Sequence, residues 1–576
     1  MTKVFHYLVC SACLASLWIL TAGRVMAVEP ADAIRELDSK VLSEDWQERA
    51  SGMVRERLRR LTTEANTKNR AEWAAIKTKA DWERYRDERI DRLRSALAEF
   101  PDPPKTLNVR TTGTVKGDGY RIENTLYETR PGFWVAANLY VPAKPRKSMP
   151  GILIASSHHR DKWQSELQDM GMTWARAGCR VLVLDEVGYG ERRAHPFNSS
   201  ADYDKEFHVS RQDYYYRFDS GVQLHLLGDS LMGWFAWDLM RGVDLLLSLP
   251  GTDSKRIIIL GAVAGGGDPC GVTAALDPRI SAAVPFNFGG PQPEIGYPLP
   301  EDAETSFNYL GGSYWDSTRG LRRGAADGFF HWVIVGSIAP RPLIYSQEFA
   351  WDRPRDPVWK RFETIWGKFY GQRDRLAFTH GKGGVRLRPP EATHCTNIGA
   401  YHRQLIHPAF KKWFDIDVTS ETEYSNRREN RELICLTDAA RRELKPKSLM
   451  NAMAAAADER IARARKTLKG KGAAERNREL RQRWTHVLGR IEPAEKPKVI
   501  GKPIQSGIAD ATVERITLQV ESGIVVPLLL LSPKHSKSEH PPIVIGLAQS
   551  GKAGFLGHRA DDIAKLLGSG VAVCLP

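Results

Sequence analysis

The sequence has few cysteines and, after its first 27 residues, no apolar run long enough to cross a membrane. Seven cysteines are spread over 576 residues, which is too few for the disulfide framework of a small secreted domain. A membrane-spanning helix needs about 20 consecutive, mostly apolar residues, and no later stretch approaches that length. We therefore expect a globular protein without stable membrane insertion.

The excess of basic residues lacks the aromatic side chains that a nucleic-acid groove needs. The formal net charge is +14, and part of it is concentrated in the helical stretch 460–498. Single-stranded nucleic acids bind where aromatic side chains are interleaved with basic ones, and that stretch shows no such interleaving. We therefore expect a solvated helical face and no nucleic-acid partner. An affinity for acidic polysaccharide is the alternative.

The first 27 residues have the features of a secretory signal. Lys3 precedes an apolar stretch from Tyr7 to about Ala22, and an A-x-A-like cleavage site ends at Ala27. This arrangement predicts a secreted or periplasmic protein that is cleaved after Ala27. An uncleaved anchor is the alternative.

Periodicity divides the following part of the chain into a helical region and an α/β region. Residues 28–104 have helical spacing and end in a proline-rich stretch, and residues 106–141 alternate as a β-meander does. From residue 151 to residue 416, short apolar strands alternate with helices. This order predicts a mainly parallel sheet with helices on both faces. We therefore expect a helical preface at 28–104 and an α/β domain at 105–420.

A similar order returns after residue 420. Residues 421–504 are rich in helix formers, a second meander follows, and the strand-like PIVIGL repeats the character of GILIAS. If Gly570 is aligned with Gly178, the chain ends one residue before the counterpart of Asp185. The pattern predicts a truncated second module at 505–576, in a fragment or a truncated gene product. A helical tail with a hairpin is the alternative.

The α/β region is organised around residues 254–276. An apolar β-branched run ends at Gly261 in a glycine-rich turn, and helical sequence follows. A strand, a sharp turn and a helix form the frame of a nucleophile elbow, which reads G-x-S-x-G. Here the frame reads GAVAG, so Val263 stands where the serine should be. Valine has no group that can attack an ester.

In order and spacing, residues 105–416 resemble the α/β-hydrolase superfamily, and within it the secreted acetyl xylan esterase-like and glucuronoyl esterase-like carbohydrate esterases. The motifs that carry the resemblance are DEVGYGER, RIIILGAVAGGG followed by AALDPRI, APRPLIY and THC. The resemblance implies an α/β-hydrolase fold, serine-hydrolase-type chemistry, and an ester-bearing carbohydrate as substrate or ligand. It implies no cofactor and no metal.

The resemblance also implies the base and the acid of a catalytic triad. The expected base is His394, which follows the last strand and precedes the closing helix. The orienting carboxylate is Glu348 or Asp352, both just after the strand PLIY, with Glu348 nearer to the strand end. A loop histidine bonded to backbone, and a carboxylate paired with Arg353 or Arg355, are the structural alternatives.

The oxyanion donors are expected at two places. The loop with Ser157 and His158 supplies the first donor, and the N–H of Ala264 supplies the second. Because Pro269 follows Asp268, we expect the helix to begin there with Asp268 as its N-cap.

Two residues near this helix start are candidates for a displaced nucleophile. One is Asp268, for which the capping role is the preferred reading. The other is Cys270, for which a structural thiol, or a disulfide with Cys395, is preferred. Ser230 is expected to open an amphipathic helix.

Two other classes of function are compatible with the sequence. One is a pseudo-enzyme that binds carbohydrate without cleaving it, in a pocket lined by Tyr297, Phe307, Tyr309 and Trp315. The other is a hydrolase whose metal ion activates water. Its candidate ligands follow predicted strands, and they are His158, His159, Asp185, His195 and His394. Their spacing matches no known metal motif.

Overall fold

The computed structural model of the protein describes residues 29–97, 99–103, 106–156, 161–193, 195, 209–291, 298–310, 321–393, 398–418, 423–489, 496–508, 510–536 and 538–576. The chain divides into two units. Unit 1 combines Met1–Arg59 with Asn477–Pro576, and unit 2 is Arg60–Arg476. None of the described helices combines the length and the apolar character that a membrane crossing requires.

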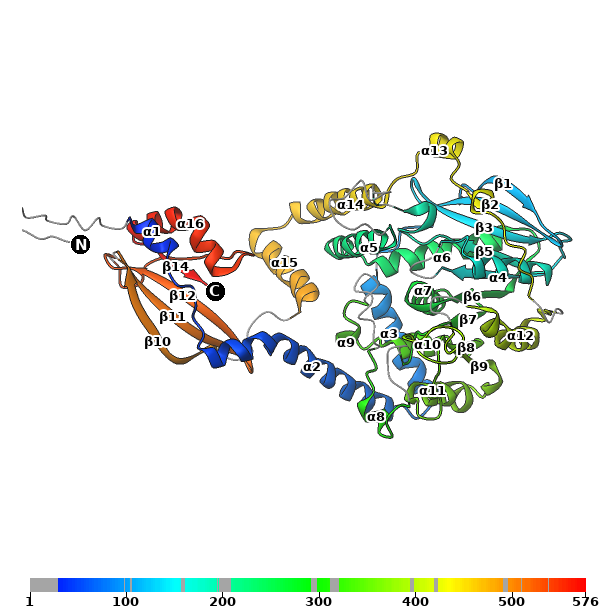
Figure 1. Ribbon diagram of the computed structural model, residues 1–576, viewed down its shortest axis with the longest axis horizontal. Coiled ribbons are helices and arrows are strands. Elements are labelled where there is room, and N and C mark those ends of the chain that lie inside the picture. Colours follow the sequence, from blue (N-terminus) through cyan, green and yellow to red (C-terminus); the bar gives the residue numbers. More distant parts are fainter. Residues whose placement is uncertain are drawn as a thin grey trace, which may run out of the picture. The chain divides into compact units, whose positions relative to one another are not determined.

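Unit 2 is built on one mixed β-sheet (Figure 1). Its described strands are β1 (Arg110–Lys116), β2 (Tyr120–Arg130), β3 (Phe133–Pro142), β4 (Met149–Ala155), β5 (Arg180–Leu184), β6 (Thr252–Gly261), β7 (Ala282–Pro285), β8 (Leu343–Gln347) and β9 (Leu376–His380). Their order is β1-β2-β3-β5-β4-β6-β7-β8-β9. The first three form an antiparallel meander, β3 is antiparallel to β5, and the strands from β5 to β9 are parallel. The parallel strands therefore all end at one edge, which we call the carboxyl edge.

Helices cover both faces of this sheet (Figure 1). The described helices of unit 2 are α3 (Lys79–Leu97), α4 (Ser165–Arg176), η1 (Gly190–Arg192), α5 (Val209–Leu226), α6 (Leu231–Ser248), α7 (Val263–Leu276), α8 (Ala303–Ser306), α9 (Gly324–Asp327), α10 (His331–Gly336), α11 (Pro357–Glu363), η3 (Thr364–Phe369), η4 (Arg373–Arg375), α12 (Ala400–Phe414), η5 (Asn430–Leu433), α13 (Asp438–Leu444) and α14 (Leu449–Lys469). Two more helices, α2 (Glu44–Ala75) and α15 (Ala473–Leu488), cross from one unit into the other.

Alternate residues of the strands enter two separate hydrophobic cores. Leu153 packs in the core formed with α3, α6, α7 and α10, which includes Trp82 and Trp332. Its neighbour Ile154 packs in the core on the other face, formed with α4 and α12. A mixed sheet, crossover helices on both faces and a tight glycine turn after the central strand β6 make up the α/β-hydrolase fold. The fold class predicted from the sequence is confirmed.

Unit 1 contains a smaller sheet that repeats part of this order. Its described strands are β10 (Lys498–Ile508), β11 (Ala511–Glu521), β12 (Ile524–Pro533), β13 (Ile543–Ile545) and β14 (Ala572–Leu575). They lie in the order β10-β11-β12-β14-β13. The meander is antiparallel, β12 is antiparallel to β14, and β13 is parallel to β14. Order and directions are therefore those of β1 to β5 in unit 2.

Two of the described helices pack on the sheet of unit 1. They are α16 (Gly551–Gly568) and α1 (Pro30–Arg35), which share one core with β11 and β12 through Leu556, Ile563 and Ile34. The helical residues before β1 are thus divided between the units, because α1 packs in unit 1 and α3 packs in the core of unit 2.

Candidate active site

The turn between β6 and α7 depends on close backbone contacts that only glycine permits. A Cβ atom on Gly261 would lie 2.2 Å from the carbonyl oxygen of Gly266, and a Cβ atom on Gly266 would lie 2.6 Å from that of Ala155. A Cβ atom on Gly267 would lie 2.0 Å from the carbonyl oxygen of Phe286. The first turns of α7 are therefore wedged between the ends of β4 and β7, as the crowded turn of a nucleophile elbow requires.

Val263 is the first residue of α7, and the extended residue Ala262 is the N-cap. The expected helix start at Pro269 is therefore wrong. Pro269 lies inside α7, and Asp268 is not an N-cap. Because the helix begins directly after the strand, its unbonded N–H groups and the positive end of its dipole lie at Val263 and Ala264. This is where the second oxyanion donor was expected.

Cys270 does not have the properties of an activated nucleophile. Cys270 is a free cysteine and is fully buried, and its thiol donates to the carbonyl oxygen of Ile259 at 3.5 Å. Burial raises the pKa of this thiol, which disfavours the thiolate. The preferred partner for a disulfide, Cys395, lies outside the described residues. Asp268 is only 7% exposed and lies in the second turn of α7.

Two serines at the carboxyl edge are also buried, and each donates its hydroxyl to the backbone. The hydroxyl of Ser156, after β4, donates to the carbonyl oxygen of Leu184 at 2.6 Å. The hydroxyl of Ser346, in β8, donates to that of Ile344 at 3.1 Å. Ser230 is the N-cap of α6, as expected, and accepts the N–H of Gly233.

The two candidate carboxylates have different surroundings. Glu348 is fully buried at the end of β8, and its N–H donates to Oδ1 of Asn287 at 2.9 Å. Asp352 accepts the N–H of Leu299 at 2.9 Å and lies 3.4 Å from the guanidinium of Arg355. Asp352 thus holds a turn and an ion pair, whereas Glu348 is at the strand end on the carboxyl edge.

The expected base and the first oxyanion loop, which are His394, Ser157 and His158, lie outside the described residues. The residue before His394 is described. The hydroxyl of Thr393 donates to the carbonyl oxygen of Glu348, and its N–H donates to that of Lys382 at 3.0 Å. The loop that leads to His394 is therefore attached to the backbone of the carboxylate expected to orient it.

One buried histidine at this edge was not singled out from the sequence. His402 is 1% exposed on α12, and its ring lies edge-on to Phe286 with the centroids 5.1 Å apart. Burial lowers the pKa of His402 to about 4. The backbone carbonyl of Glu348 acts in the opposite direction and raises the pKa of His402. Neither ring nitrogen of His402 has a hydrogen-bond partner of acceptable geometry within the described residues. The i, i+4 spacing of His402 with Ile406 and Phe410 could have placed it on the buried face.

The described members of the expected metal set have other partners. Asp185 accepts the N–H groups of Lys162 at 2.7 Å and Glu191 at 3.0 Å. His195 lies 2.7 Å from Asp213. The other three histidines of that set lie outside the described residues. Within the described part of the chain, no group of three or more His, Cys, Asp or Glu side chains could hold a metal ion.

Two members of the expected aromatic lining of a carbohydrate pocket are described, and both are buried. Phe307 and Tyr309 are 7% and 1% exposed and belong to the core of unit 2. The guanidinium carbon of Arg361 lies 4.0 Å from the centroid of the Tyr309 ring. Tyr297 and Trp315 lie outside the described residues.

Solved structures with some likeness to this chain include esterases. A methylesterase is 18% identical, with a TM-score of 0.48 over 70% of this chain and 81% of its own. A glucuronoyl esterase from Solibacter usitatus is 16% identical, with a TM-score of 0.39 over 59% and 95% of the two chains. An acetyl xylan esterase from Paenibacillus sp. R4 is 14% identical, with a TM-score of 0.33 over 60% and 99%. No protein-family model and no curated protein matches. At identities this low, the activity of these esterases cannot be assigned to this chain.

Proposed function

We propose that this is a secreted or periplasmic carbohydrate-esterase-like protein whose unit 2 binds ester-substituted carbohydrate without forming an acyl-enzyme. The observation that carries the proposal is the position of Val263 as the first residue of α7. Covalent ester hydrolysis needs an attacking group at that turn. An oxyanion hole and a histidine alone leave residual catalysis of about 10³–10⁴-fold over water.

In this proposal Glu348 orients His394, and Asp352 is structural. The attachment of Thr393 to the carbonyl of Glu348 supports this choice. The proposed donors to the carbonyl oxygen of the ester are the loop of Ser157 and His158 and the N–H of Ala264. The predicted signal sequence of residues 1–27 supports the location.

We also propose that residues 505–576, in unit 1, are a second copy of the first part of the hydrolase module. The shared order and directions of five strands support this repeat. The helix α16 between β13 and β14 corresponds to α4 between β4 and β5.

The test combines binding and turnover on one sample of the full chain. Isothermal titration calorimetry with an acetylated xylo-oligosaccharide should show saturable binding, and the same mixture should release little acetate. Absence of binding would refute the proposed ligand class. Robust acetate release that is lost in Asp268→Asn or Cys270→Ala would show that the nucleophile has moved.

A further inference from the structure

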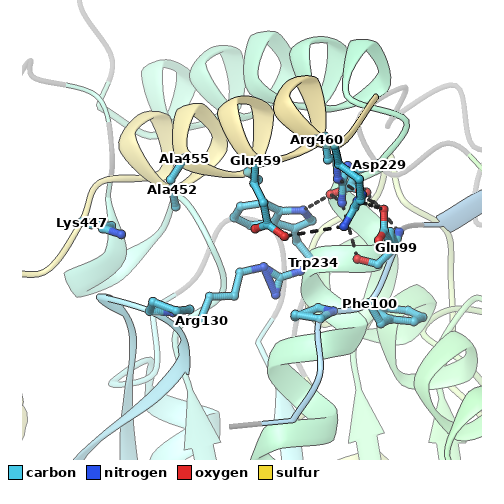
Figure 2. A pocket seen from close by; sticks show the side chains of 14 residues that line it. Glu99, Phe100, Arg130, Asp229, Trp234, Lys447, Ala452, Ala455, Glu459 and Arg460 are labelled. Carbon is cyan, nitrogen blue, oxygen red and sulfur yellow. Dashed lines mark hydrogen bonds and ion pairs between the residues drawn. The ribbon is translucent and has the colours of Figure 1, made fainter. Parts of the chain in front are cut away.

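A cavity of about 310 Å³ lies in unit 2 between the β2–β3 turn, the start of α6 and α14 (Figure 2). The rings of Phe100, Pro101 and Pro131 and the alanines of α14 supply apolar wall. Because Ala137 of β3 pairs with Leu184 at the end of β5, the β2–β3 turn lies at the carboxyl edge. The strand order β3-β5-β4-β6 puts three strand spacings, roughly 14 Å, between the strand that begins at this turn and the strand that ends at the elbow.

The acidic groups of the cavity already have cationic partners. Arg460 lies 2.8 Å from a carboxylate oxygen of Asp229, and Arg463 lies 2.6 Å from a carboxylate oxygen of Glu99. The indole N–H of Trp234 also donates to Asp229 at 2.9 Å. Figure 2 shows this cluster at one end of the cavity, away from Lys447.

Within the described part of the chain the guanidinium of Arg130 forms no ion pair, and the carboxylates of Asp238 and Asp229 only partly offset the effect of burial on its pKa. The guanidinium lies over the Trp234 ring, with Cζ 4.2 Å from the centroid, beneath the indole in Figure 2. Its Nη1 is buried and has no hydrogen-bond partner in the described part of the chain. Burial lowers the pKa of Arg130 to about 10. Arg130 is half-buried, and a partly desolvated cation without a hydrogen-bonded counter-ion is destabilising, so an incoming anion would relieve that cost.

We propose that this cavity binds a small organic molecule through its carboxylate, which pairs with the guanidinium of Arg130. A carboxylate matches the planar fork of arginine. The nearby carboxylates of Glu99, Asp229 and Glu459 disfavour a dianion such as phosphate, and the apolar wall suits a ring. Lys447, exposed at the rim, adds a second positive charge. The inference rests on these contacts and not on the proposed esterase-like function.

Titration calorimetry on the full chain tests the proposal with two matched probe pairs. D-glucuronate is compared with D-glucose, and benzoate with benzamide. At least one carboxylate should bind, and its neutral counterpart should bind at least about tenfold more weakly, as expected for a charge-assisted hydrogen bond. The pair that responds identifies a sugar acid or an aromatic acid. If neither carboxylate binds, or if inorganic phosphate binds more tightly than both, the proposal is wrong.

Arg130→Met is the decisive variant because it keeps an apolar stem beside Trp234 and removes the charge. Binding of the carboxylate should weaken at least about tenfold, while the thermal unfolding midpoint stays equal or rises. The exposed Arg84→Gln, outside the cavity, should bind as the unmodified chain does. If Arg130→Met does not fold, Lys447→Gln should still weaken binding by about threefold at low salt. Unchanged affinity in the folded Arg130→Met, or failing that in Lys447→Gln, overturns the proposal.

Discussion

Replacing Gly267 by alanine tests the packing of the elbow. The new Cβ atom would lie 2.0 Å from the carbonyl oxygen of Phe286, whereas ordinary contact begins at 3.4 Å, so the gap must open by about 1.4 Å. The atoms nearest to the new Cβ are all backbone atoms of Phe286, and the N–H of Phe286 donates to the carbonyl oxygen of Gly261 at 3.1 Å. Overpacking of this kind costs about 3 kcal/mol. Alanine has a higher helix propensity than glycine, which stabilises the folded state by about 1 kcal/mol. The unfolding free energy should therefore fall by about 2 kcal/mol.

Urea unfolding followed by tryptophan fluorescence measures this loss. The matched control is Gly384→Ala, because a Cβ atom there meets nothing within 4 Å and Gly384 is in the same unit. Gly384→Ala should leave the unfolding free energy within about 0.5 kcal/mol. If Gly267→Ala were as stable as this control, α7 would not lie against β7 as described, and the elbow would be misassigned.

Two further variants test buried charge in unit 2. Lys162→Met removes a fully buried ammonium that donates to Glu191 at 2.5 Å and lies 3.8 Å from Asp185, and two buried carboxylates without their cation should cost about 3–5 kcal/mol in urea unfolding. An exposed control, Lys411→Met, should be unchanged, and equal losses would refute burial as the cause. Because the pKa of His402 is about 4 when folded, the unfolded chain takes up a proton first as pH falls below 6.5. When the pH is lowered from 6.5 to 4, His402→Gln should therefore lose up to about 3 kcal/mol less unfolding free energy than the unmodified chain. His331 is still present in the variant and contributes its own loss of stability over this pH range. A loss in His402→Gln as large as that of the unmodified chain would contradict this assignment.

The strands were predictable because their signal is local. The apolar run at Arg180–Leu184 and the alternation in Phe133–Pro142 are visible in the sequence, and both are strands. The closing helix α12 was also predicted within two residues of its start. The α/β-hydrolase order then followed from how strands and helices alternate.

The start of α7 was not predictable from local preference. Three glycines and Pro269 all disfavour a helix, yet α7 runs through them. The close contacts of Gly266 with Ala155 at the end of β4, and of Gly267 with Phe286 just after β7, fix the helix there, and neither contact can be read from the local sequence. Tertiary packing thus overrides propensity at the one turn that matters most for the site.

The cavity at Arg130 could not be predicted for the same reason. Its walls come from the end of β2, the start of α6 and α14, which are far apart along the chain. The pairing of Arg460 with Asp229 depends on how α14 packs, and in the described part of the chain Arg130 forms no ion pair of its own. The periodicity of residues 449–469 indicates a helix and does not indicate its partner.

The most direct measurement of the central claim is acetate release by Val263→Ser. The claim is that unit 2 keeps the elbow and lacks only the attacking group. The serine variant should therefore hydrolyse a small acetylated sugar well above the unmodified chain, and adding His394→Ala should abolish the gain. Equal and robust acetate release by the unmodified chain, or no gain in a folded Val263→Ser variant that still binds the acetylated sugar, would contradict the account.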